Sequence, residues 1–508
     1  MQIHEQLLRR GIVPCFLATC AFFMVNNGVL GKLASPWLIV YLVKALLETV
    51  ASVYALFYCF VAACYSRPSA TVSASRQDGF ADATAIVYLC CDDIDEEALL
   101  SVAASARAAG IQLIVHDDST TDLNRMIVTQ QIERLRSRMG LMPLLLRRKV
   151  HSGGKAAALN NVVSQLPAKI KFLMVCDSDS FVYDLGFLAK AMEYFRDPNV
   201  AIAQFRTIGH ADINASRGYC MLSLSVTFYD AFVYFLDKFG WSAFLGHNAI
   251  VRVSAIRDVS GFTPGELADD IDFSVKVRLR GWKTRYAREI VCGERHPEDY
   301  GALRRRTGKW AYGCTQILRQ WGWKVLSCPR LTVAERTTFL LTVSYYHFQV
   351  AMLLYLTLVC CVIPFDPSQS TEVRSQLAAA LIILLITFVP SVSFFRSMQA
   401  IRQWPRAALS WGLTYGSQDL VCIRAIYRCL RSVPLRWVPT NRADSVADRS
   451  IFLPELLLGA VLLVVPAWLA PQLLLLPTTL LFSVKYLAAP LLDTYAFDRI
   501  HRTRRARV

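Results

Sequence analysis

Residues 171–179 read KFLMVCDSD, an apolar run of strand length that ends in two aspartates separated by a serine. The run predicts a buried strand, so Asp177 and Asp179 lie directly at its end. Two carboxylates so placed can hold a hard cation such as Mg²⁺ or Mn²⁺ while substrate phosphates complete its coordination. The alternative is a solvated turn that caps the next helix. The neighbouring sequence favours the cation site.

Two further strands precede this one. Residues 84–90 (TAIVYLC) are followed by a helical pattern at 96–109, and residues 112–115 (QLIV) run into Asp117 and Asp118. Strands that alternate with helices predict a mostly parallel sheet, whose ligands bind at the carboxyl ends of the strands. The acidic clusters therefore mark the edge where a nucleotide would bind.

Two other segments carry charges suited to phosphate and proton transfer. Gly153-Gly154-Lys155 precedes an apolar helix start, a pattern typical of a phosphate-binding backbone with a cation beside it, although it is not a Walker A motif. Asp269 and Asp270 open a helix predicted over 269–281. Two roles are open for them. Both aspartates stabilise the N-terminus of the helix by their charge, or Asp270 acts as a general base.

Apolar residues are concentrated at both ends of the chain. Of 508 residues, 54% are hydrophobic and only 19% charged, which excludes a disordered chain and an ordinary soluble protein. A bilayer core needs about 20 apolar residues as helix. Six such spans are predicted, at 11–31, 37–64, 339–361 and 377–395, with two more within 451–492 that turn at Pro471-Gln472.

The distribution of basic residues predicts how the chain is oriented in the membrane. The net charge is +16, and the basic residues gather beside the apolar segments, which favours an anionic membrane leaflet over nucleic acid as the partner. By the positive-inside rule, both termini and the central region are cytoplasmic. The expected division is 1–72 (membrane), 73–336 (cytoplasmic α/β domain), 337–397 (third and fourth spans), 398–450 (cytoplasmic) and 451–508 (fifth and sixth spans with a basic tail).

Three charged residues fall inside predicted spans. Lys44 and Glu48 lie four apart, and Lys485 lies in the last span. Intramembrane charges often mark transport paths, but an ion pair within one helix or snorkelling to the interface explains them equally well.

The order of the motifs resembles that of the inverting family 2 glycosyltransferases, and more narrowly that of the membrane-embedded cellulose, chitin and hyaluronan synthases. The resemblance spans about 84–313 and rests on five segments: HDDSTTD at 116–122, GKAAALNN at 154–161, DSD at 177–179, GHNA at 246–249 and DDID at 269–272. It implies a GT-A domain, a Rossmann-like fold that binds a nucleotide sugar, with six transmembrane helices and interfacial amphipathic helices.

The resemblance also implies roles for single residues. Asp117 and Asp118 would contact the base or ribose, and Lys155 would lie beside the diphosphate. Asp177 and Asp179 match the D-x-D that holds nucleotide and metal. In the family's T-E-D motif the aspartate is the general base, which corresponds to Asp270, and Asp269 stands for the glutamate beside the acceptor.

Two later segments depart from the family pattern. RTGKW at 306–310 keeps the acceptor-binding tryptophan of Q-x-x-R-W as Trp310 but has Lys309 in place of arginine. A lysine supplies charge to a pyrophosphate without a bidentate fork. An amphipathic helix is expected over 406–431. After it, WVPTNR at 437–442 is similar to the gating loop of cellulose synthases, whose threonine and basic residue, here Thr440 and Arg442, would close over the donor.

The predicted enzyme is a membrane-embedded hexosyltransferase that polymerises a β-linked polysaccharide from a nucleotide diphospho-sugar. UDP-glucose is favoured by the gating-loop similarity, and UDP-N-acetylglucosamine is the chitin- or hyaluronan-type alternative. The growing chain would leave through the enzyme's own channel in the plasma (inner) membrane, alone or with an accessory export subunit. Three alternatives stay open: a transferase that adds one sugar to a membrane lipid, a transporter with a regulatory nucleotide-binding domain, and an inactive scaffold.

Overall fold

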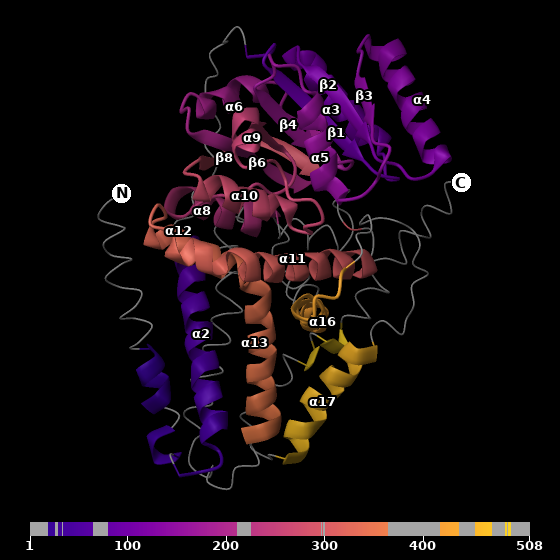
Figure 1. Cartoon of the computed structure of the whole chain (residues 1–508). Coiled ribbons are helices and arrows are strands. Elements are labelled where there is room, and N and C mark those ends of the chain that lie inside the picture. Colours follow the sequence, from indigo (N-terminus) through magenta and orange to yellow (C-terminus); the bar gives the residue numbers. More distant parts are fainter. Residues whose placement is uncertain are drawn as a thin grey trace.

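The computed structural model places an α/β domain above a set of upright helices, with further helices lying across the boundary (Figure 1). It describes residues 19–25, 29–32, 34–63, 80–210, 225–295, 297, 300–363, 417–435, 453–469, 483–484 and 486–488.

One eight-stranded sheet forms the centre of the domain, in the order β3-β2-β1-β4-β7-β6-β8-β5. The strands are β1 (Thr84–Cys90), β2 (Gln112–Asp117), β3 (Leu144–Arg147), β4 (Phe172–Cys176), β5 (Ser180–Val182), β6 (Val200–Gly209), β7 (Ala249–Arg252) and β8 (Lys283–Glu294). The first four strands pair in parallel, as predicted. The second half is mixed, because β7 runs antiparallel to both β4 and β6, and β5 runs antiparallel to β8.

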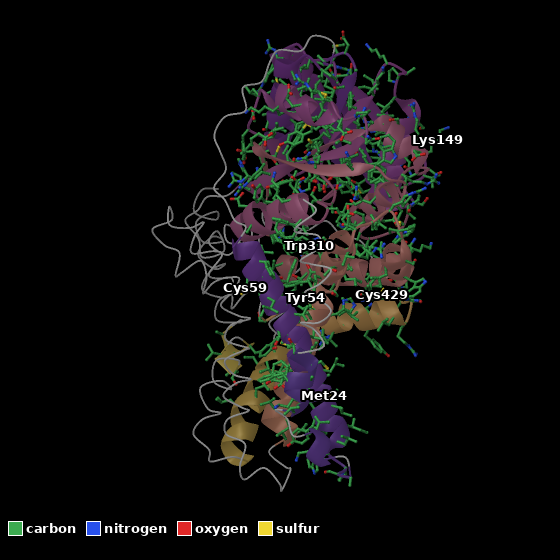
Figure 2. All side chains as sticks on the ribbon, turned by 90° about the vertical axis from the view of Figure 1, so that its left-hand side faces the viewer. Met24, Tyr54, Cys59, Lys149, Trp310 and Cys429 are labelled. Carbon is green, nitrogen blue, oxygen red and sulfur yellow. The ribbon has the colours of Figure 1, made fainter. Side chains whose placement is uncertain are left out.

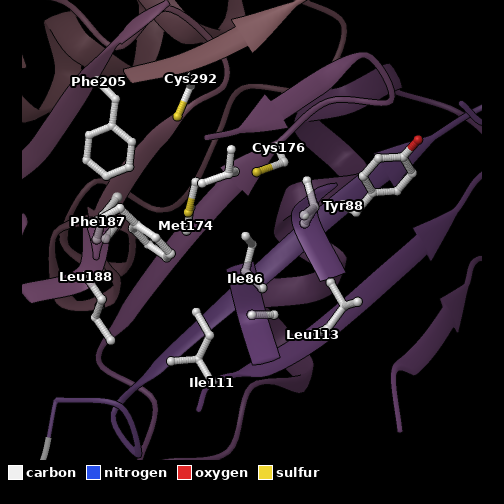
Figure 3. Packing of buried hydrophobic residues seen from close by; sticks show 14 of the residues in the cluster. Ile86, Tyr88, Ile111, Leu113, Met174, Cys176, Phe187, Leu188, Phe205 and Cys292 are labelled. Atoms are coloured by element: carbon white, nitrogen blue, oxygen red, sulfur yellow. The ribbon is translucent and has the colours of Figure 1, made fainter. Parts of the chain in front are cut away.

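Helices cover both faces of the sheet. Those of the domain are α3 (Glu96–Ala109), α4 (Asp122–Met139), α5 (Gly154–Gln165), α6 (Phe187–Phe195), α8 (Tyr234–Phe239), α9 (Val253–Asp258) and α10 (Asp269–Leu279), with a π-helix η2 (Ser225–Val233). Apolar residues of α3, α4 and α6 pack on one face, where Ile86, Met174 and Phe187 lie close together (Figure 3). Those of α5, α9 and α10 pack on the other. Alternate β1 side chains enter the two cores, as strand geometry requires.

The remaining helices are η1 (Val29–Lys32), α2 (Leu38–Ala63), α11 (Tyr300–Ser327), α12 (Val333–Val343), α13 (Tyr345–Thr357), the π-helix η3 (Leu358–Val362), α16 (Asp419–Leu430) and α17 (Leu453–Leu469). α11 and α12 lie across the boundary, while α2 and α13 run away from the domain (Figure 1). Within the described ranges, Leu38–Val61 is long and apolar enough to cross a membrane, and α12 with α13 passes the same criterion as a pair bent by 60°. Six spans therefore stay a prediction, and the one at 377–395 lies outside the described residues.

The predicted span at 339–361 is not one straight helix. The chain turns at Ser344, whose hydroxyl donates to the Leu340 carbonyl (2.5 Å) and lies 2.7 Å from the Tyr54 hydroxyl of α2. A serine that bonds back to the carbonyl four residues earlier bends a helix. As a result, α12 lies along the domain and the upright segment begins at Tyr345.

The ion-pair interpretation of Lys44 and Glu48 is confirmed. The Lys44 Nζ lies 3.3 Å from the Glu48 Oε1 and both side chains are buried. The Tyr355 hydroxyl of α13 donates to the same carboxylate (3.2 Å), so this charge joins two helices. Lys485 lies outside the described residues, as does the first part of the predicted helix 406–431, of which α16 is the described part.

Candidate active site

The candidate site lies at the sheet edge where β1, β2, β4 and β8 end. Because these strands share one direction, the residues that follow them meet there. The segment 177–180 turns tightly: the Ser180 amide donates to the Asp177 carbonyl (3.1 Å), and the Ser180 hydroxyl accepts from the Asp177 amide (2.9 Å). Residues 246–248 reach the same edge, because the Asn248 amide donates to the Val175 carbonyl at the end of β4 (2.7 Å).

Residues from four of the motifs come together around Gly246. The Lys155 Nζ lies 2.5 Å from the Asp177 Oδ1. A Cβ added to Gly246 would lie 3.3 Å from that Nζ and 3.3 Å from the Asp270 Oδ2. Burial by itself would lower the pKa of Lys155, but Asp177, Asp269 and Asp270 together raise it. Lys155 therefore stays protonated, and its positive charge lies among three acidic side chains.

Burial disfavours the ionised form of three acidic side chains at this edge, Asp179, Asp269 and Asp270. Burial raises the pKa of Asp179 to about 7 and that of Asp269 to about 7, and burial also raises the pKa of Asp270. Asp177, Glu294 and Asp93 add repulsion at Asp179, while His247 opposes it. Such crowding of acids favours a bound cation.

Two acidic residues that the motifs did not identify also belong to this edge. Asp93 follows β1 and accepts from the Ser178 hydroxyl (2.9 Å), and burial raises its pKa to about 6. Glu294 ends β8, 3.3 Å from the His247 Nε2. The sequence carries a signal for Asp93, because acidic residues follow the strand 84–90 after one cysteine, much as they follow the other two strands.

Asp117 and Asp118 are each held by an arginine. The Arg147 Nε donates to the Asp117 Oδ2 (2.7 Å), and the Arg148 Nε donates to the Asp118 Oδ1 (3.0 Å). His151 lies 3.3 Å from the same Asp118 oxygen. The structure thus brings these aspartates to the same edge of the sheet, as part of a charged network that includes two arginines absent from the motif.

α11 brings the altered R-T-G-K-W segment to the domain. A Cβ on Gly313 would lie 2.7 Å from the Ala268 Cβ, so only glycine lets α11 approach the residue before Asp269 this closely. The Arg306 guanidinium lies over the Trp310 ring at 4.7 Å and 3.9 Å from Glu294. Trp310 lies at the boundary with the upright helices (Figure 2), and its side chain is 39% exposed. Thr440 and Arg442 lie outside the described residues.

Replacing Gly246 with alanine is expected to reduce kcat/KM for sugar transfer by about 10- to 100-fold. The new Cβ would press on Asp270 and Lys155, and the φ of +91° disfavours any side chain. Gly265→Ala is the matched control, because its φ is +86° and nothing lies within 4 Å of an added Cβ. Equal activity of the two variants would contradict the role given to Gly246.

The lowered pKa of Lys309 leads us to expect that activity falls at alkaline pH. Burial, followed by repulsion from Arg305 and Arg306, lowers its pKa to about 8. Its charge is therefore present below pH 8 and lost above it, so kcat/KM for the donor should fall through that range. Lys309→Arg should remove this limb, because arginine stays protonated. Lys283→Arg, at an exposed lysine paired with Asp197, is the control. An unchanged profile in Lys309→Arg would contradict the assignment.

Comparison with known proteins shows which family the chain resembles. Residues 172–395 match the model for glycosyl transferase family group 2. Glucomannan 4-beta-mannosyltransferase 7 of Arabidopsis thaliana is 26% identical over 369 residues, which cover 69% of this chain and 64% of that protein. Glucomannan 4-beta-mannosyltransferase 1 of Cyamopsis tetragonoloba is 23% identical over 57% of this chain and 55% of its own length. The chain thus spans less than two thirds of either relative.

Among solved structures, the mannosyltransferase PcManGT from Pyrobaculum calidifontis, in complex with GDP-Man and Mn²⁺, superposes with a TM-score of 0.47 at 16% identity, covering 77% of this chain and 98% of that one. The family match and the curated relatives agree with the sheet, whose acidic edge lies where a nucleotide sugar would bind. Residues 172–395 therefore match a family 2 glycosyltransferase domain, and the sheet around them is of the Rossmann-like α/β type.

Proposed function

We propose that the enzyme transfers a mannosyl group, with inversion, from a nucleoside-diphospho-mannose to a growing β-linked polysaccharide. The observation that carries this proposal is the meeting of Lys155, Asp177 and Asp270 around Gly246. An inverting transfer needs a charge that stabilises the departing diphosphate and a base that faces the acceptor. This cluster supplies both from adjacent side chains.

A divalent cation fits the donor set at this edge. Asp177 and Asp179 would hold Mg²⁺ or Mn²⁺, because carboxylate oxygens are the ligands these ions prefer. Among the described residues, no group of three or more histidines, cysteines, aspartates or glutamates is placed to hold a metal alone. Diphosphate oxygens would therefore complete the coordination. When bound, the cation supplies positive charge to the leaving diphosphate.

Each remaining role in the reaction is assigned to a residue of this chain. Asp270 accepts the proton of the acceptor hydroxyl, and its raised pKa makes it a better base than an exposed aspartate. Lys155 stabilises negative charge on the diphosphate, and Lys309 adds a second cation below pH 8. Trp310, which is partly exposed, would contact an acceptor sugar, and Asp269 precedes the proposed base in the sequence.

The choice of mannose rests on the relatives, which are named glucomannan 4-beta-mannosyltransferases. The prediction of UDP-glucose depends on the gating-loop similarity at residues 437–442, which lie outside the described residues. We further propose that the domain faces the cytoplasm of the cell that makes the protein, at the plasma membrane. The α2 and α13 helices would anchor the domain in the bilayer, and the polymer would leave between the upright helices. The domain's position at one end of these helices supports this arrangement (Figure 1).

The test incubates membranes that contain the full chain with radiolabelled GDP-mannose, UDP-glucose or UDP-N-acetylglucosamine, each with Mg²⁺ or Mn²⁺. A long polymer sensitive to a β-mannanase is expected from GDP-mannose. A single-sugar lipid product would contradict polymerisation, and incorporation from UDP-glucose alone would contradict the mannosyl donor. No product from any donor, in a preparation shown to be folded, would contradict the enzyme itself.

A further inference from the structure

The hydroxyl of Tyr88 lies against the backbone of the D-S-D segment. Tyr88 belongs to β1 and its ring is buried in the core on the α3 side of the sheet, with its oxygen at the end of the cluster (Figure 3). The hydroxyl donates to the Ser178 carbonyl at 2.7 Å and accepts from the Asp95 amide at 3.1 Å. A buried phenol therefore joins the ends of two strands that are 90 residues apart in the sequence.

Ser178 is held a second time through its side chain. Its hydroxyl donates to the Asp93 Oδ2 (2.9 Å), and the Asp93 Oδ1 accepts from the Cys91 amide (2.6 Å). The middle residue of the segment is thus fixed at its carbonyl and at its hydroxyl by residues at the end of β1. The two aspartates on either side have fewer degrees of freedom as a result.

The remaining backbone of the segment is held from the other side. The Arg295 amide donates to the Asp179 carbonyl (3.2 Å), and the Ser180 hydroxyl accepts from the Asp177 amide (2.9 Å). Tyr88 supplies the contact on the β1 side. A phenylalanine would fill the same core without the cost of burying a hydroxyl, so the bonds made by this oxygen are the reason for a tyrosine here.

We infer that Tyr88 is a positioning residue for donor binding: its hydroxyl fixes the Ser178 peptide and so aims Asp177 and Asp179 at the cation and diphosphate of the nucleotide sugar. This inference rests on the proposed function, in which those two aspartates hold the cation. Ligand-holding carboxylates depend on the groups that orient them, and loss of such a group typically weakens metal affinity by 10- to 100-fold.

The test compares Tyr88→Phe with Tyr286→Phe in the purified full chain. Tyr286 is also buried, and its hydroxyl has no hydrogen-bond partner within the described part of the chain. Two quantities are measured: the Mn²⁺ concentration that gives half-maximal transfer, and the Mn²⁺-dependent binding of GDP and of UDP by calorimetry. Tyr88→Phe should raise the half-saturating Mn²⁺ concentration about tenfold and weaken diphosphate binding by a similar factor. The kcat at saturating Mn²⁺ should stay within about threefold.

The control separates positioning from stability. Tyr286→Phe should bind Mn²⁺ and diphosphate as the wild type does. If Tyr88→Phe changes only the Tm, or if both variants shift equally, the inference is overturned. Ser178→Gly, which loosens the same peptide without altering the core, should reproduce the Mn²⁺ effect, and it serves if Tyr88→Phe does not fold. If the wild type transfers sugar and Tyr88→Phe has the same Mn²⁺ requirement and diphosphate affinity, this inference alone is overturned. If the wild type transfers no sugar, the proposed function is overturned.

Discussion

Asp270→Asn is expected to lower kcat for sugar transfer by about 10²- to 10⁴-fold, the usual contribution of a general base. Asparagine keeps the shape and the hydrogen bond from the Ile271 amide but cannot accept a proton. Because donor binding does not require this carboxylate, the KM for the nucleotide sugar should change little. The measurement is initial rate against donor concentration in membranes with equal amounts of protein.

Asp272→Asn is the matched control for that experiment. Asp272 lies on the same helix, but its two oxygens accept from the Trp321 Nε1 (2.7 Å) and the Thr263 hydroxyl (2.5 Å). Its replacement should lower the Tm while kcat stays within about tenfold. If Asp270→Asn retains wild-type kcat, the base assignment is wrong, and a large loss in Asp269→Asn would transfer the role to its neighbour.

The parts of the fold that the sequence predicts well are those set by local pattern. β1 and α3 begin and end where the apolar run 84–90 and the amphipathic stretch 96–109 indicate. The helix at 96–109 has a capping aspartate before it and a glycine after it, both of which act locally. The strand β4, which ends at Cys176 just before Asp177, was likewise identifiable, because its apolar run has the length of a buried strand.

The parts that could not be predicted depend on contacts between distant residues. Nothing local distinguishes the antiparallel β7 from a parallel strand, because its direction is set by pairing with β4 some 75 residues earlier. At the bend between α12 and α13, the Ser344 hydroxyl also contacts Tyr54, 290 residues away, and nothing local predicts this contact. Glu294 enters the site only because β8, remote in the sequence, ends beside His247. Motif order pointed to the carboxylates for which we propose catalytic roles, whereas the groups that orient them required the structure.

The buried ion pair between α11 and α17 carries the second large prediction. The Arg304 Nη1 lies 2.6 Å from the Glu455 Oε1, with the two side chains 7% and 0% exposed. Arg304→Met would leave the Glu455 carboxylate buried without its counter-charge, and such losses cost about 3–5 kcal/mol. We expect the free energy of unfolding to fall by about that amount, measured as thermal or denaturant unfolding of the full chain in nanodiscs.

Two controls test whether the loss of stability comes from leaving a buried charge unpaired. Arg134→Met breaks the Arg134–Glu96 pair, which has a similar separation of 3.2 Å but is half exposed, and it should cost less than about 1 kcal/mol. The double variant Arg304→Met with Glu455→Leu removes both buried charges and should recover most of the lost stability, because a buried pair replaced by apolar groups is often neutral. If Arg304→Met costs no more than Arg134→Met, the pair does not hold the two helices together.

The double variant also distinguishes a packing role from a catalytic one. Arg304 lies on the helix that carries Lys309 and Trp310, five and six residues before them. Its ion pair with α17 therefore fixes the position of those two side chains relative to the upright helices. If the pair acts only through stability, the double variant recovers activity together with its Tm. If it also aligns α11 on the domain, the Tm recovers while the KM for the acceptor stays raised, because α17 no longer sets the position of Trp310.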